Sequence, residues 1–166
     1  MAHQQWPPWE VTSSLNNLHQ LRELVERPKE AAVTSEALGW LSRLLVVRSC
    51  GYLEQAVAFC GRGYVQAKSG GLVRAFSLTW LTRTRNPSYG ALLELAGRFD
   101  LGLRDELEQT LKADDARLEK DLHALVDRRN RIAHGENEGI GRDRALSLST
   151  SSEALADWWI LALKPY

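Results

Sequence analysis

Residues 118–135 read LEKDLHALVDRRNRIAHG, and this stretch decides the fold class. Its apolar residues are spaced three or four apart, as on one face of a helix. They are Leu118, Leu122, Leu125 and Val126. The same face then continues with Arg129 and Asn130, and His134 follows one turn after Asn130. Polar side chains at the end of a buried face need an explanation beyond packing.

Helical spacing also accounts for the other apolar segments, and no segment has the period-two alternation of a strand. We expect the first ten residues to be irregular, since Pro7 and Pro8 break a helix there. Helices are then expected over residues 12–27, with Thr12–Ser14 as N-cap candidates, 34–68, 72–80, 89–98, 103–111, 115–134 and 151–163. Gly102 should separate two of them, Asp114 and Asp115 should cap the motif helix, and residues 135–149 should form a loop.

The sequence therefore predicts one all-α domain over residues 1–166. It should be a bundle of four to five helices, with a short helical insertion between the second and third main helices. The long second helix carries apolar residues on several sides, which is typical of a central helix. Within it, Arg48 and Glu54 either lie on the solvent face, or Glu54 points inward toward a buried arginine.

Composition limits the partners of this domain. Lys+Arg and Asp+Glu both number 21, so contact with nucleic acid must come from a few placed arginines. Cys50 and Cys60 are ten residues apart in one helix, about 15 Å of rise, too far for a disulfide. No apolar run reaches the ~20 residues of a membrane span. These features predict a cytoplasmic protein with reduced thiols.

The sequence lacks the spacings that several chemistries require. The histidines (His3, His19, His123 and His134) form no metal-binding pair, so no metal and no cofactor are expected. Gly61–Arg62–Gly63 is too short for a phosphate loop or a dinucleotide turn, and no Gly-x-Ser-x-Gly turn occurs. A Cys–His nucleophile pair is disfavoured because both cysteines occupy apolar helix positions.

Two accounts of Arg129, Asn130 and His134 stay open from spacing alone. An arginine and a histidine near a helix C-terminus can bind its last carbonyls, and Gly135 suits the residue after the cap. Asn130 fits this capping account poorly, because a weak helix former on the inward side needs a specific partner. The other account is a functional site.

The segment LVDRRNRIAHG (residues 125–135) resembles the signature of the HEPN superfamily, whose members are all-α bundles. Their motif is Arg, a polar residue, three to five further residues and His, late in a helix. The stretches LLVVRSCGYLEQAV, NPSYGALLELAGRF and SSEALADWW are similar to patterns of its RiboL-PSP-like branch. The resemblance covers roughly residues 36–163 and leaves out the first helix.

This resemblance implies metal-independent cleavage of RNA that leaves a 2′,3′-cyclic phosphate and a 5′-OH. His134 would be the general acid or base, and Arg129 would hold the scissile phosphate. Asn130 would orient His134 or the ribose hydroxyl, and Glu54 would support them. The solvent-facing Arg128 and Arg131 are assigned to RNA binding.

The motif has one histidine per chain, short of the acid and base that cleavage needs, and the resemblance implies a homodimer in which two motifs share a cleft. An antitoxin or regulatory protein is a further expected partner, and tRNA fits as a structured substrate. HEPN toxins silenced by adenylylation carry Tyr two residues after the His, whereas this chain has Glu136. Two alternatives to a nuclease remain: a catalytically weak module that binds RNA, a nucleotide or a protein, and a purely structural domain.

Overall fold

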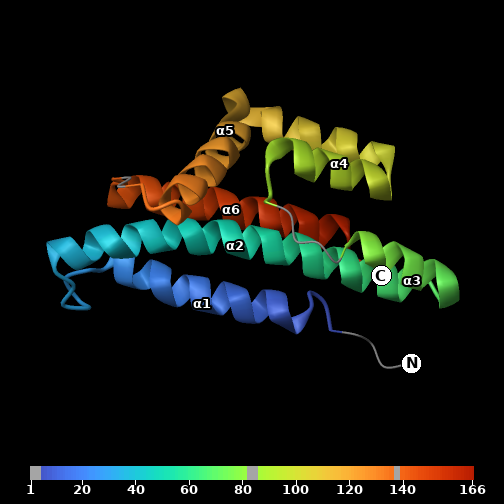
Figure 1. The fold of residues 1–166 in the computed structure, drawn as a ribbon, viewed down its shortest axis with the longest axis horizontal. Helices are drawn as coiled ribbons and strands as arrows, with labels where there is room; N and C mark the ends of the chain where they lie inside the picture. Colours follow the sequence, from blue (N-terminus) through green and yellow to red (C-terminus); the bar gives the residue numbers. More distant parts are fainter. Residues whose placement is uncertain (1–4, 82–85, 137–138) are drawn as a thin grey trace.

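A computed structural model describes residues 5–81, 86–136 and 139–166. These residues form six helices and no strand, which confirms the all-α prediction. In chain order the helices are α1 (Trp9–Glu26), α2 (Ser35–Lys68), α3 (Gly71–Trp80), α4 (Tyr89–Phe99), α5 (Leu101–Ala133) and α6 (Arg142–Ala162). Figure 1 shows α1, α2 and α6 side by side along the long axis of the molecule.

The 34-residue helix α2 is the centre of the bundle, as its broad apolar surface predicts. It contacts α1, α3, α5 and α6, and it begins where the side chain of Thr34 accepts a hydrogen bond from Ala37 N at 3.2 Å. Cys50 and Cys60 are buried free thiols within it. The core is therefore arranged around α2, and among the described helices only α4 has no close backbone approach to it.

The helix α5 is bent into two arms, with non-helical backbone at residues 113–116. Asp114, Asp115 and Ala116 have φ between 49° and 57°, so the two aspartates form the bend itself and do not cap the second arm. The first arm packs on α4, and the second crosses α2 and α6 (Figure 1). The break before α5 lies at Asp100, whose side chain caps Leu103 N, and Gly102 is helical.

The helix α6 begins at Arg142, nine residues before the predicted start, so the loop expected over residues 135–149 is too long. The missed part, residues 142–150, buries only Ala145, Leu148 and Ser149, which gives a weak apolar pattern. The next turn buries two further serines. Ser151 Oγ donates to Asp121 Oδ2 at 2.6 Å, and Ser152 Oγ donates to Ser49 O at 2.7 Å. Hydrogen bonds to α5 and α2 make these small polar residues compatible with burial.

The helix α1 begins at Trp9, directly after Pro8, and not at Thr12–Ser14. The irregular N-terminal segment predicted for residues 1–10 therefore ends at Pro8, and residues 1–4 lie outside the described ranges. Trp6 Nε1 donates a hydrogen bond to Ile160 O at 2.9 Å, which fastens the segment before α1 to α6.

Candidate functional site

The polar residues of the motif helix are joined by hydrogen bonds at the end of α5. Arg129 and Asn130 are both partly buried. Asn130 Oδ1 accepts from Arg129 Nη1 at 3.1 Å and from Asn86 Nδ2 at 3.3 Å. One carbonyl oxygen thus orients the Arg129 guanidinium and fastens the segment before α4 to the motif helix.

Asn86 was not among the site residues predicted from the sequence. The residues Asn86–Pro87–Ser88 are typical of a helix boundary, and Ser88 does cap α4 by accepting from Ala91 N at 3.4 Å. Its contact with Asn130 spans 44 residues, and helical periodicity carries no information on such a pair. The only sequence signal is its place at the start of NPSYGALLELAGRF.

His134 is the C-cap residue of α5, and its ring is exposed. No hydrogen bond joins the ring to another of the described residues. The last carbonyls of the helix are bonded by backbone groups instead: Gly135 N donates to Ile132 O at 3.1 Å, and Glu136 N donates to Arg131 O at 3.0 Å. Gly135 has φ of +77°, as this C-terminal motif requires. The His134 side chain is therefore not needed to cap the helix.

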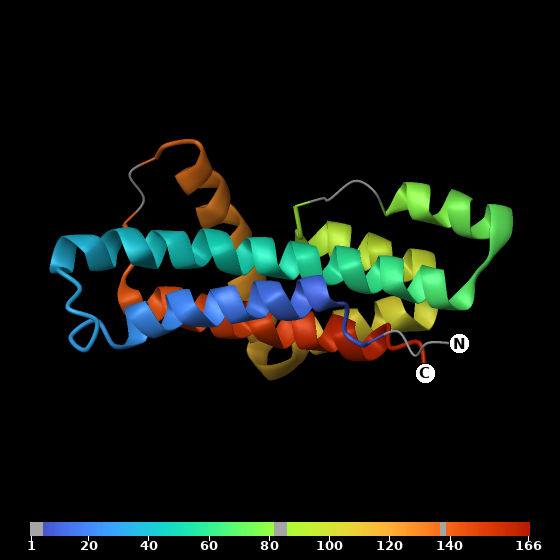
Figure 2. The ribbon, with the colours of Figure 1, turned by 90° about the horizontal axis from the view of Figure 1, so that it is seen from below.

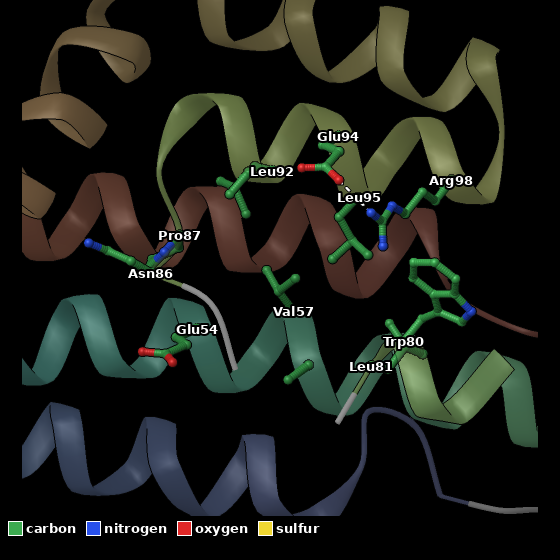
Figure 3. A pocket seen from close by; sticks show the side chains of 12 residues that line it. Glu54, Val57, Trp80, Leu81, Asn86, Pro87, Leu92, Glu94, Leu95 and Arg98 are labelled. Carbon is green, nitrogen blue, oxygen red and sulfur yellow. Dashed lines mark hydrogen bonds and ion pairs between the residues drawn. The ribbon is translucent and has the colours of Figure 1, made fainter. Parts of the chain in front are cut away.

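Glu54 lies on α2, partly buried, at the edge of a cleft that also borders Asn86 (Figure 3). Arg48, in contrast, is exposed. Within the described ranges, no hydrogen bond or ion pair joins the Glu54 carboxylate to Arg129 or Asn130. Glu54 and Asn86 line the same cleft, and Asn86 bonds Asn130, so the supporting role of Glu54 stays a prediction.

The charges of Arg129 and Glu54 both change the pKa of a buried thiol, that of Cys50. Burial raises the pKa of Cys50 to about 11, while the positive charge of Arg129 lowers it and the negative charge of Glu54 raises it. Burial also raises the pKa of Cys60 to about 12. Because both thiols keep their protons at neutral pH, they are poor nucleophiles.

The cleft beside the motif is small, with a cavity volume of about 60 Å³. It lies between α2 and α4, with Trp80 of α3 at one end and the polar groups of Glu54 and Asn86 at the other (Figure 3). Its walls are largely apolar. Asn86 Oδ1 is buried and has no hydrogen-bond partner among the described residues. A buried acceptor without a partner beside an open space is suited to a ligand that donates a hydrogen bond.

The two flanking arginines bind their own chain. Arg128 Nη1 donates to Gly139 O at 3.4 Å, and Arg131 Nε bonds Glu136 Oε2 at 2.8 Å. Arg131 is exposed, as predicted, while Arg128 is partly buried. Their assignment to RNA binding remains a prediction.

Asp121 holds the second arm of α5 in place. This aspartate is only 5% exposed and bonds Arg144 Nη1 at 2.7 Å as well as Ser151 Oγ. Both partners belong to α6. The end of the motif helix is therefore positioned by a buried polar contact two turns before Arg129.

Three further features of the described residues concern metal-binding groups, the other histidines and membrane-spanning helices. The residues that the structure describes contain no group of three or more His, Cys, Asp or Glu able to hold a metal ion. His19 bonds Glu153 at 2.9 Å, and His123 stacks on Tyr89, so both are engaged elsewhere. Among the described helices, none is long and apolar enough to cross a membrane.

Fold and site together define an all-α bundle with an Arg–Asn pair and a histidine at the end of one long helix, the class of the HEPN domains. Comparison with protein families gives the assignment directly. The family model described as RiboL-PSP-HEPN matches residues 10–157, so the chain belongs to this family. The match includes α1, which the resemblance seen in the sequence left out. Neither the curated proteins nor the solved structures gave a match.

Membership of this family favours a nuclease or an RNA-binding role in general. It does not by itself assign catalysis to Arg129, Asn130 or His134. Their role has to be argued from the geometry at the end of α5.

Proposed function

We propose that this protein is a metal-independent endoribonuclease that acts as a homodimer. The observation that carries the proposal is that side chains and backbone groups have separate roles at the end of α5. Asn130 orients the Arg129 guanidinium, while backbone groups cap the helix and leave the His134 ring exposed. An oriented guanidinium and an available imidazole on one helix end are what phosphodiester transfer without metal requires.

In the proposed reaction the ribose 2′-oxygen attacks the adjacent phosphorus, and the bond from phosphorus to the 5′-oxygen breaks. The products are a 2′,3′-cyclic phosphate and a 5′-OH. Arg129 binds the non-bridging phosphate oxygens, where negative charge accumulates in the transition state. Asn130 keeps the guanidinium in place, and Glu54 supports the site from α2.

Two protons have to move in this step. One base takes the proton of the 2′-OH, and one acid gives a proton to the departing 5′-oxygen. His134 is suited to either task, because imidazole titrates near neutral pH. A homodimer supplies both, with His134 of one chain as the base and His134 of the other as the acid. Arg128 and Arg131 bind the RNA backbone on either side.

For the biological setting we propose a toxin or a defence effector in the cytoplasm, with a structured RNA such as tRNA as its substrate. The balanced charge of the chain supports a specific target over general attraction to RNA. An antitoxin or regulatory protein would restrain it. Adenylylation of a tyrosine after the motif is not the proposed means, because Glu136 occupies that position and pairs with Arg131.

A second candidate is a HEPN-like module that binds RNA, a nucleotide or a protein without cleaving it. The buried Asn86 Oδ1 beside the cleft favours it, since that acceptor awaits a donor whether or not a bond is cleaved. The two candidates differ in one measurable respect. A binding module retains its function when His134 is removed, whereas the nuclease loses it.

The test is RNA cleavage in EDTA, with sequencing of new 5′-OH ends. We expect wild type to cleave, and His134→Ala to lose ~10²–10⁴-fold in rate because proton transfer is removed. Arg129→Ala should be comparably inactive, and Arg129→Lys should restore little, because a point charge does not replace the guanidinium fork.

The matched control is His123→Ala, an exposed histidine on the same arm of α5, which should cleave like wild type. All variants should keep the helical circular dichroism of wild type. A folded His134→Ala variant that cleaves like wild type would overturn the assignment of catalysis to this residue.

A further inference from the structure

The helix α3 has an apolar surface that the chain leaves uncovered. None of its ten residues is buried. Among the described helices only α2 packs closely against it, and from α4 the Arg98 guanidinium lies over the Trp80 ring, 4.8 Å from its centroid. Leu72, Val73, Phe76 and Trp80 follow helical spacing on one stripe, and they are 89, 66, 66 and 55% exposed. A continuous exposed stripe of large apolar side chains marks an interaction surface.

A second exposed apolar pair lies near the other end of α2. Trp40 is 63% exposed and Leu44 is 46% exposed, one turn apart. Trp40 precedes Ala58 by 18 residues, which is five turns at 3.6 residues per turn, so the two share one side of α2. Ala58 and Trp80 of α3 line the same cleft. The pair and the α3 stripe therefore face the same side of the molecule.

These two surfaces lie at similar distances from Glu54 along α2. Leu44 and Trp40 are 10 and 14 residues before Glu54, about 15–21 Å at 1.5 Å per residue. On the other side, Leu81 packs at Gly61, 7 residues after Glu54, and α3 starts just beyond the end of α2. The α3 stripe thus lies about 10–21 Å from Glu54, measured along α2 toward its C-terminal end.

We propose that a second copy of this chain packs antiparallel along this side of α2. The α3 stripe of each copy then covers Trp40 and Leu44 of the other, so that one two-fold axis produces both contacts. The axis passes near Glu54. Figure 2 shows that α3 and the C-terminal end of α5 project on the same side of α2, so the motif end also faces the partner.

A second copy fits this surface better than a partner of opposite charge. Arg74 is the only charged residue of α3, and its guanidinium already bonds Ser69 O. Arg98, which lies over Trp80, is paired with Glu94, and Arg43 lies over Trp40. The charged groups of α3 and α4 at this surface therefore already have partners within the chain. Aromatic side chains present ~150–250 Å² each, so Trp40, Phe76 and Trp80 leave on the order of 400 Å² exposed. A standard interface buries about 800 Å² per partner, of which about 57% is apolar. The three aromatic residues nearly supply that apolar part.

The inference rests on the proposed function only because it assigns a surface to the dimer proposed there. Association of the two chains is measured without RNA. In light scattering at micromolar concentration, wild type should be a dimer. Phe76→Glu and Trp40→Glu should each give folded monomers, because either charge would be buried in both symmetric contacts. Leu161→Glu on α6, at a leucine that is 72% exposed, is the matched control and should stay dimeric.

Disulfide cross-linking tests the antiparallel arrangement. A chain with both Trp40→Cys and Phe76→Cys should form a covalent dimer on oxidation, whereas either substitution alone should not. The native Cys50 and Cys60 are buried and do not compete. A covalent dimer from Phe76→Cys alone would place α3 against α3 and overturn the proposed arrangement.

Monomeric wild type would likewise overturn the inference, whatever the protein does to RNA. A dimer that forms as described but cleaves no RNA would leave this interface standing and refute the nuclease proposal. The two failures are therefore distinguishable.

Discussion

His134 and Gly135 are neighbours with separate tasks at the end of α5. Gly135 takes the left-handed backbone conformation that lets two backbone N–H groups cap the helix. The His134 ring, exposed beside it, contributes nothing to that cap. A side chain that a helix does not need for stability can be retained for chemistry.

This separation predicts different stabilities for two adjacent alanine variants. Gly135→Ala should lower the free energy of unfolding by about 1 kcal/mol, since φ of +77° is costly for a residue with a Cβ. His134→Ala should change it by less than ~0.5 kcal/mol, as an exposed substitution. Urea denaturation of both variants beside wild type measures the difference. An equal loss in the two would make the imidazole a structural group.

At this scale the sequence predicted part of the candidate site. Arg129 and Asn130 stand out because they continue an apolar stripe, and the structure joins them by a hydrogen bond. Asn86 could not be found, because its role depends on a contact across 44 residues. Glu54 was named through the resemblance, and in the structure it lines the same cleft as Asn86.

The second arm of α5 presents the motif, and its own position depends on Asp121. Apolar contacts along this arm set its rotation about the core. The Asp121 carboxylate then holds it against α6 through Arg144 and Ser151. Because the carboxylate is buried, removing it leaves the buried Ser151 hydroxyl without an acceptor and ends the ion pair with Arg144, which is partly exposed to solvent.

We therefore expect Asp121→Ala to lower the free energy of unfolding by about 2–3 kcal/mol. Chemical denaturation followed by circular dichroism measures it. Asp143→Ala is the matched control on α6, because the Asp143 side chain is 90% exposed in its pair with Arg142, and such pairs contribute less than ~1 kcal/mol. If both variants lose the same small amount, Asp121 is not what holds the motif helix.

Helix periodicity predicted the elements better than their ends. It located α2 and α3 to within one residue at each end, because Thr34 and the Gly70–Gly71 pair punctuate the chain clearly. It missed the start of α6, where the apolar pattern is weak, and the start of α1, where Pro8 precedes the first turn. Two of the three left-handed residues at 114–116 are aspartates, which tolerate this backbone conformation, but the same residue type is also favoured as a helix cap.

For the whole molecule, the exposed apolar surfaces and the single motif histidine lead to the same requirement. One chain leaves the α3 stripe uncovered, and one chain has a single histidine where proton transfer needs two groups. A two-fold dimer meets both requirements at once. The resemblance and the single motif histidine predict a dimer, which stays a prediction, whereas exposure of α3 depends on which helices pack against it.

A shared site makes a quantitative prediction for mixed dimers. Wild type and His134→Ala are mixed at constant total protein, left to exchange subunits, and assayed for RNA cleavage. If each reaction needs His134 from both chains, a half-and-half mixture should retain about one quarter of the activity, because random pairing makes one dimer in four fully wild type. If each chain cleaves RNA on its own, the mixture should retain about half of the wild-type activity. As a control for the mixing procedure, wild type is mixed with Leu161→Glu, and the activity should be unchanged. A decline in proportion to the wild-type fraction would contradict the shared site and leave each His134 acting alone.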